Sequence, residues 1–166
     1  MENKTNKMHV TFDAKSVNEA FARMTVMAFM TDMNPTLDEL EDVKTAVSEA
    51  VTNAIIHGYG NVWGYSKHRN LVPPGAERKE GKVTLRCKLE EGILIVEVLD
   101  KGVGIEDISK AMEPLYTSKP ELDRSGMGFS FMEAFMDDLQ VESKPGEGTR
   151  ITMKKKLACG PWIGRE

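Results

Sequence analysis

The start of the chain combines a short alternating segment with a helical pattern. Residues 9–12 alternate between polar and apolar side chains, which predicts a strand. Apolar residues then recur at helical spacing over residues 17 to about 33, and Ser16 stands where a helix N-cap is expected. This pattern predicts an amphipathic helix, with apolar positions at Val17, Ala20, Phe21, Met24 and Ala28.

Four methionines recur at every third position of this first helix, at Met24, Met27, Met30 and Met33. Methionine fills irregular gaps in a core, but methionine-rich faces also suit adaptable binding of other proteins. We expect ordinary core filling, with a dimer or partner surface as the alternative.

A second helical pattern follows the Asn34-Pro35 pair, because proline disfavours helical geometry in the residue before it. Thr36 followed by Glu39 forms a capping-box pattern, and Gly58 is suited to end the helix. The apolar stripe predicts the side of this helix that faces the core, formed by Leu40, Val43, Val47, Val51 and Ala54.

The remainder of the chain predicts two hairpins and one more helix. Residues 59–81 have no steady period and predict a long surface loop. Residues 82–100 read as a hairpin with a turn at Glu91-Gly92, and residues 139–157 as a second hairpin. Between them lie an irregular segment rich in glycine and a helix over residues 129–135.

These elements predict an α+β fold: a two-layer sandwich with a mostly antiparallel sheet and the helices on one face. A chain of 166 residues fits one domain. We expect that domain to span residues 1–157, with a loop insertion at about 61–80 and a C-terminal tail at 158–166.

Composition and charge narrow the classes of function. Hydrophobic residues make up 40% and charged residues 29%, and no apolar run approaches the roughly 18 residues that span a bilayer. With no signal-peptide pattern at the N-terminus, we expect a cytoplasmic protein. The two cysteines, Cys87 and Cys159, are too few for a disulfide framework and favour reduced thiols.

The net charge of −4 argues against broad binding to nucleic acid, and we expect neither a nucleic acid nor a membrane as a direct partner. The exception is the basic run at residues 154–156, which we interpret as a solvated strand end.

Glu49, Asn53 and His57 lie one turn apart on the second helix, away from its apolar stripe. A polar stripe usually faces water, but asparagine is a poor choice for an exposed helix interior. Its amide oxygen is a suitable ligand for Mg²⁺, and Glu49 could then take a proton from an incoming hydroxyl. For His57 we favour a structural hydrogen bond over a role as metal ligand or phosphoacceptor.

The motif Asp-Lys-Gly-Val-Gly at residues 100–104 follows the most apolar strand. An ionised carboxylate at that position is costly unless it accepts hydrogen bonds. The exocyclic amine of adenine would supply a donor, and Gly102 and Gly104 would let the backbone approach the base.

The segment before the last helix ends in Ser-Gly-Met-Gly at residues 125–128. Backbone N–H groups at a helix N-terminus form an anion site suited to phosphates, although a simple connecting loop remains the alternative. The preceding residues could close over a triphosphate with hydroxyls and a cation. The candidate phosphate-binding residues are Thr117, Ser118, Lys119, Arg124, Ser125, Gly126, Met127 and Gly128.

Neither a P-loop nor the His-Arg-Asp loop of protein kinases is present in the sequence. The order of motifs instead resembles the ATP-binding (Bergerat) fold shared by gyrase, Hsp90, histidine kinases and MutL: a helix with Glu and Asn, a strand ending in Asp-x-Gly-x-Gly, a lid ending in Gly-x-Gly, and Gly148-Thr149 on a last strand. Within that superfamily, residues 47–59 and 114–138 resemble the sporulation anti-sigma F factors, which are serine-protein kinases.

This resemblance implies roles for individual residues. Asn53 would bind Mg²⁺, Glu49 would be the general base, and Asp100 would contact the adenine of ATP or ADP. The nucleotide pocket would be shaped by Gly102, Gly104, Gly126, Gly128 and Thr149.

The resemblance also implies the partners. It implies a homodimer that holds sigma F in an inactive complex and phosphorylates a serine of an anti-anti-sigma factor. Arg23 matches a family arginine and is a candidate partner contact. Two alternatives stay open: a general stress-type anti-sigma kinase with a different sigma factor, and a regulator that binds nucleotide without catalysis.

Overall fold

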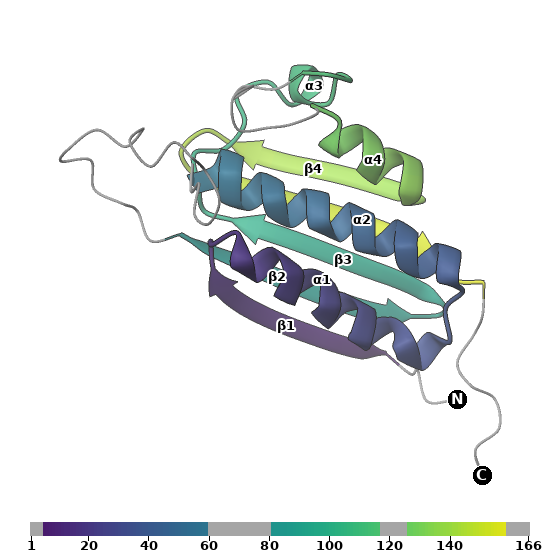
Figure 1. The fold of residues 1–166 in the computed structure, drawn as a ribbon. Coiled ribbons are helices and arrows are strands. Elements are labelled where there is room, and N and C mark those ends of the chain that lie inside the picture. Colours follow the sequence, from purple (N-terminus) through teal and green to yellow (C-terminus); the bar gives the residue numbers. More distant parts are fainter. Residues whose placement is uncertain (1–4, 60–80, 117–125, 159–166) are drawn as a thin grey trace, which may run out of the picture.

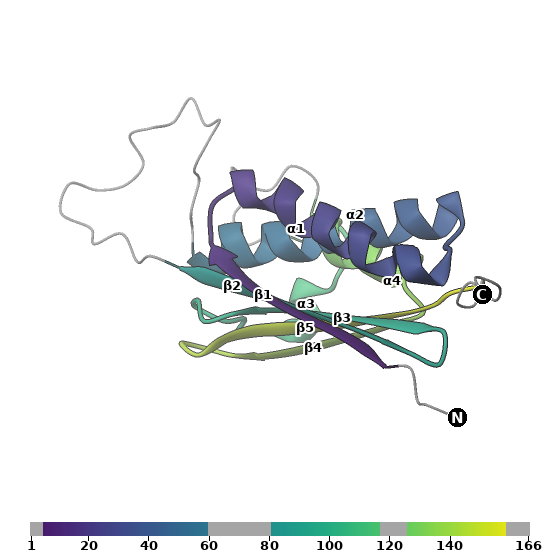
Figure 2. The same ribbon diagram turned by 90° about the horizontal axis from the view of Figure 1, so that it is seen from below.

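The computed structural model describes residues 5–59, 81–116 and 126–158. Five antiparallel strands form one sheet in the order β1-β2-β3-β5-β4, and the helices cover one face of it (Figures 1 and 2). The elements are β1 Asn6–Asp13, α1 Val17–Met30, a 3-10 turn Thr31–Met33, α2 Leu37–Asn53, a π-helical turn Ala54–Gly58, β2 Lys82–Glu90, β3 Ile93–Asp100, α3 Ile108–Ala111, α4 Gly128–Phe135, β4 Asp138–Lys144 and β5 Gly148–Lys156. The predicted α+β class is confirmed.

The core lies between the helices and the inner face of the sheet. Helix α2 runs along the middle of the sheet and contributes Val43, Val47 and Val51, all fully buried. These side chains belong to the same core cluster as Leu85 of β2 and Met153 of β5. The apolar stripe predicted for this helix is therefore its core face.

The start of α2 follows its sequence signal. Thr36 Oγ1 accepts a hydrogen bond from Glu39 N at 3.2 Å, and Thr36 N donates to Glu39 Oε2 at 2.8 Å. Both bonds of the predicted capping box are present. Ser16 does precede α1, but its backbone is already helical and its side chain makes no capping bond, so this capping role was predicted wrongly.

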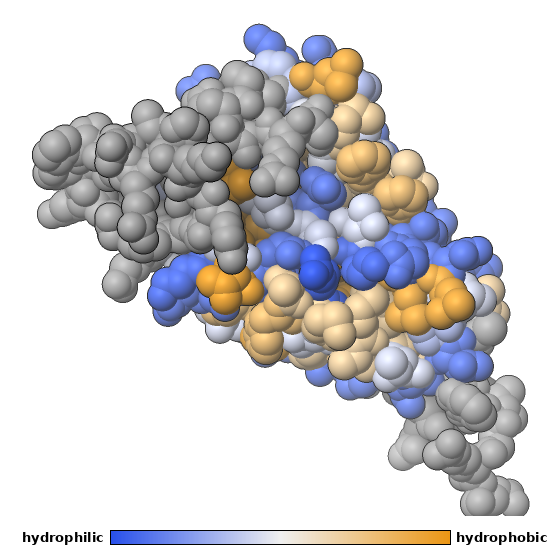
Figure 3. Space-filling view, in the orientation of Figure 1, coloured by the Kyte–Doolittle hydropathy of each residue, from blue (hydrophilic) through white to orange (hydrophobic). Residues whose placement is uncertain are grey.

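Helix α1 is rotated relative to the expectation of core filling. Its buried residues are Ala22, Val26 and Met30, whereas Phe21 is 51% exposed and Met24 is 61% exposed. The helix carries apolar residues on two sides, and only one side contacts the sheet. Core filling is therefore right for Met30 and wrong for Met24, and apolar surface lies over α1 in Figure 3.

The basic run at the end of β5 is paired rather than simply solvated. Lys154 Nζ lies 2.9 Å from Asp138 Oδ2. Lys155 Nζ lies 2.9 Å from Asp42 of α2 and donates to the carbonyl oxygen of Phe135 at 2.7 Å, so it joins α2, α4 and β5. These contacts link the end of β5 to β4, α2 and α4, and the interpretation as a solvated strand end is wrong for Lys155.

In the described parts of the chain, no helix has the length and apolar character needed to cross a bilayer.

Candidate active site

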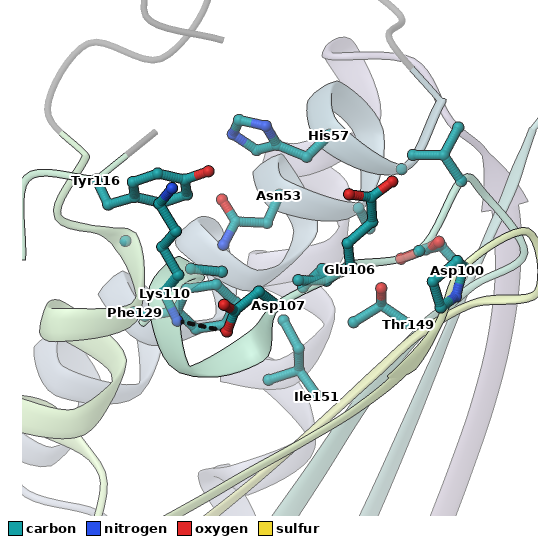
Figure 4. Close-up of a pocket in the computed structure, with 18 of the residues that line it drawn as sticks. Asn53, His57, Asp100, Glu106, Asp107, Lys110, Tyr116, Phe129, Thr149 and Ile151 are labelled. Atoms are coloured by element: carbon teal, nitrogen blue, oxygen red, sulfur yellow. Dashed lines mark hydrogen bonds between the residues drawn. The ribbon is translucent and has the colours of Figure 1, made fainter. Parts of the chain in front are cut away.

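A cavity of about 490 Å³ lies where the end of α2, the segment after β3 and the start of α4 meet (Figure 4). Six of the predicted site residues line it, and they come from four separate segments of the chain. These residues are Asn53, Asp100, Gly104, Gly126, Gly128 and Thr149.

The N-terminus of α4 packs directly against the polar face of α2. A Cβ atom on Gly128 would lie 3.0 Å from Glu49 Oε2 and 3.4 Å from both amide atoms of Asn53. Only a residue without a side chain allows this approach without displacing its neighbours. The first helical residue of α4 thus lies against the side chains of Glu49 and Asn53.

Asp100 ends β3 and is half-buried at the opposite side of the cavity. Its Oδ1 accepts a hydrogen bond from Gly102 N at 2.8 Å. Burial raises the pKa of Asp100 above its ordinary value, although backbone N–H groups of Gly102 and Thr149 favour the ionised form and offset part of this effect. The site thus holds a desolvated carboxylate that can accept a donor from a ligand.

The segment after Asp100 is drawn tightly against the end of α2. A Cβ atom on Gly102 would lie 2.1 Å from the carbonyl oxygen of Gly58, which itself accepts from Val103 N at 2.9 Å. The π-helical turn over Ala54–Gly58 presents this carbonyl, and such turns often occur at functional sites. Gly102 therefore permits the close contact beneath the cavity but does not itself line it.

Thr149 is held by Ser143, a residue that was not predicted from the sequence. Ser143 Oγ lies 2.8 Å from Thr149 Oγ1, donates to Gly148 O at 3.0 Å and accepts from Ile105 N at 2.8 Å. Ser143 is paired with Thr149 in the β4–β5 ladder. A polar residue at an inward position of an otherwise apolar strand face was the signal available for it.

Only the two ends of the lid, the segment between α3 and α4, lie within the described residues. Leu115 N donates to Gly126 O at 2.9 Å, so the residues that flank the lid are joined beside the cavity. Met127 is the N-cap residue of α4. The other lid candidates, Thr117, Ser118, Lys119, Arg124 and Ser125, lie outside the described residues.

Arg23 lies apart from the cavity, on α1. Its guanidinium group pairs with Glu19 at 3.1 Å. It does not line the cavity, which separates the partner candidate from the nucleotide candidates.

Comparison with known proteins places the chain in a family. Residues 11–155 match the family model of the histidine kinase-like ATPase domain. The chain is 56% identical over 153 residues to the anti-sigma F factor of Clostridium acetobutylicum, covering 92% of this chain and 95% of that protein. The chain belongs to the anti-sigma F factor family. Another member, from Geobacillus kaustophilus, is 49% identical over 153 residues, or 92% of this chain and 94% of that one.

A similar fold occurs in a solved structure whose sequence identity with this anti-sigma F factor family member is low. The crystal structure of the RsbU and RsbW domains of Rv1364c from Mycobacterium tuberculosis superposes with a TM-score of 0.59 at 18% identity. The match covers 97% of this chain and 34% of that chain, and it bears on the fold alone.

Proposed function

We propose that this chain is an anti-sigma factor and an ATP-dependent protein serine kinase that acts in the cytoplasm. In this proposal it binds a sigma F-like factor, blocks its use by RNA polymerase, and phosphorylates a serine of an anti-anti-sigma factor during sporulation. The kinase part depends on one observation above all, the approach of Gly128 to Glu49 and Asn53 at the edge of the cavity. We further propose that residues 1–157 act as one domain, with an insertion at about 61–80 and a tail at 158–166.

The cavity suits an adenine nucleotide that spans it from end to end. The carboxylate of Asp100 would accept the exocyclic amine of adenine, with Gly104 and Thr149 around the base. The N–H groups at the start of α4, at Gly128, would face the phosphates, because a helix N-terminus favours anions. We propose that the lid adds contacts from Thr117, Ser118, Lys119, Arg124, Ser125, Gly126 and Met127.

The donor set fits Mg²⁺ bound jointly by protein and phosphate. Asn53 offers a hard amide oxygen to the cavity. Among the described residues, no three His, Cys, Asp or Glu side chains gather to hold a metal, so a cation would take most of its ligands from phosphates and water. Bound Mg²⁺ would neutralise negative charge on the phosphate oxygens.

Glu49 is the proposed general base for transfer. The serine hydroxyl oxygen of the substrate protein forms a bond to the γ-phosphorus, and its proton passes to the Glu49 carboxylate. The bond between the γ-phosphorus and the bridging oxygen breaks, and ADP leaves with that electron pair. No covalent enzyme intermediate is needed, because phosphoryl transfer depends mainly on positioning and charge stabilisation.

The test is a phosphorylation assay with labelled ATP, Mg²⁺ and a candidate anti-anti-sigma protein. Glu49→Gln should abolish transfer while ATP still binds, whereas Asn53→Ala should weaken Mg-ATP binding. Glu41→Gln, an exposed position on the same helix, is the matched control and should leave both unchanged. Full transfer by both site variants would reject the assignment. ATP binding without transfer in the unmodified protein would favour the non-catalytic regulator.

The exposed face of α1 is the surface we propose for partner binding and for a homodimer. Val17 is 71% exposed and, with Phe21 and Met24, forms apolar surface that the fold leaves uncovered (Figure 3). Arg23 lies on the same helix and would add a polar contact to the partner.

The double variant Phe21→Ser, Met24→Ser should shift the protein toward monomer in sedimentation experiments. Leu37→Ser, which removes an exposed apolar side chain outside α1, is the control. An unchanged dimer in the double variant would exclude this surface. Pull-down with different sigma factors would decide between sigma F and a general stress-type partner.

A further inference from the structure

The short helix α3 places one cation at the end of the cavity opposite Asp100. Asp107 caps this helix, because its Oδ1 accepts a hydrogen bond from Lys110 N at 3.0 Å. The side chain of Lys110 then extends into the cavity, where its ammonium group lies 5.3 Å from the centroid of the Tyr116 ring (Figure 4). Neither α3 nor a role for Lys110 was predicted from the sequence.

The cavity has a direction. In Figure 4, Asp100 and Thr149 lie together at one side, Lys110 and Tyr116 lie at the other, and Asn53 lies between them. A nucleotide with its base at Asp100 would therefore run past Asn53 toward Lys110. The end of the phosphate chain would be the part nearest to the ammonium group.

The charges around the cavity make this lysine unusual. Among the described residues that line it, Lys110 is the only lysine or arginine, whereas Asp100, Glu106 and Asp107 supply carboxylates. Within the same described set, no carboxylate forms a salt bridge with Lys110. Its contact with the Tyr116 ring orients the ammonium group without neutralising it, and the charge stays available to an anion.

We propose that Lys110 is a phosphate-binding residue that recognises the terminal phosphate of the nucleotide and sets a preference for ATP over ADP. This inference depends on the proposed function, since it assigns one end of the same nucleotide site. Tyr116 is the positioning residue, because its ring holds the ammonium group at the cavity wall. Lys110 would act alongside the lid and the start of α4, from a separate element.

The experiment is a set of calorimetric titrations of the whole chain with Mg-ATP, Mg-ADP and adenosine. A charge-assisted hydrogen bond gives an expected loss of roughly tenfold or more in ATP affinity for Lys110→Met. ADP affinity should fall by less than about threefold, because its phosphate chain ends sooner, and adenosine affinity should not change. Lys110→Arg should retain most of the preference.

Lys44→Met on α2 is the matched control, because it removes a lysine outside the cavity and should bind all three ligands normally. Unaltered ATP affinity in Lys110→Met would overturn the inference, as would an equal loss for adenosine. In both cases the proposed function would stand as long as the unmodified protein binds Mg-ATP. Failure of the unmodified protein to bind Mg-ATP would overturn both.

Discussion

Substitution of Gly128 by alanine tests the contact on which the kinase assignment depends. The new methyl group would lie 3.0 Å from Glu49 Oε2, which is closer than carbon and oxygen atoms normally approach. Its distance to the Asn53 amide would be 3.4 Å, an ordinary contact. The carboxylate of Glu49 must therefore shift by a few tenths of an ångström, while Asn53 can stay in place.

The magnitude follows from these distances. Misplacement of a catalytic group by about 1 Å can cost roughly 100-fold in rate, so a smaller shift should cost roughly tenfold. Alanine is a better helix former than glycine by up to about 1 kcal/mol, and the unfolding free energy should stay the same or rise slightly. Gly128→Ala should therefore impair phosphate transfer without destabilising the fold.

Single-turnover transfer at saturating Mg-ATP, together with urea denaturation, measures both effects. The matched control is Glu133→Ala, an exposed position on the same helix, which should transfer phosphate at the normal rate. ATP affinity of Gly128→Ala should fall less than the transfer rate. A normal transfer rate, or a loss that follows a loss of stability, would refute the reasoning.

Three other side chains give predictions with simpler readouts. Burial raises the pKa of Asp100, so its carboxylate should be protonated at a higher pH than an exposed aspartate, and adenosine affinity should begin to fall at that higher pH when the solution is acidified. The same acid-induced loss of adenosine affinity in Asp100→Asn would contradict this prediction. Burial raises the pKa of Cys87 to about 12, so this thiol should react slowly in the native protein. In a Cys159→Ser background, a thiol reagent should label the native protein slowly and the unfolded protein rapidly; rapid labelling of the native protein would contradict the burial of Cys87. Lys155→Met should lower the unfolding free energy, measured in urea, by about 1–3 kcal/mol, whereas Lys44→Met, at a more exposed lysine, should lower it by less than about 0.5 kcal/mol. Equal effects of the two substitutions would contradict a stabilising role for the Lys155 contacts.

The sequence predicted α2 well because its signals agree. A single apolar stripe and the Thr36–Glu39 capping box both specify where the helix begins and which side is buried. Helix α1 was harder, because it carries apolar residues on two sides and only tertiary packing decides which side contacts the sheet. Phe21 and Met24 are consequently exposed. The short helix α3 was not predicted, because four residues are too few to show a helical period.

Part of the site was likewise predicted from local sequence patterns, and part of it depends on tertiary packing. Spacing alone put Glu49 and Asn53 on one helix face, and resemblance joined them to the glycines of the lid. The packing of α4 against α2 decides that Gly128 approaches Glu49, and no local pattern carries that information. Lys110 was missed for the same reason, because the cavity that it enters is formed by segments far apart in the sequence. Ser143 could have been found from the sequence, because it is a polar residue on an otherwise apolar strand face.

We propose that the Asn53-bearing face of α2 holds a magnesium–adenine nucleotide against the start of α4. Calorimetric titration of ATP with and without Mg²⁺, into the unmodified protein and into Asn53→Ala, tests it most directly. We expect Mg²⁺ to strengthen ATP binding roughly tenfold or more in the unmodified protein, and we expect Asn53→Ala to lose most of that gain. An equal effect of Mg²⁺ in both proteins, or no ATP binding by the folded unmodified protein, would contradict the account.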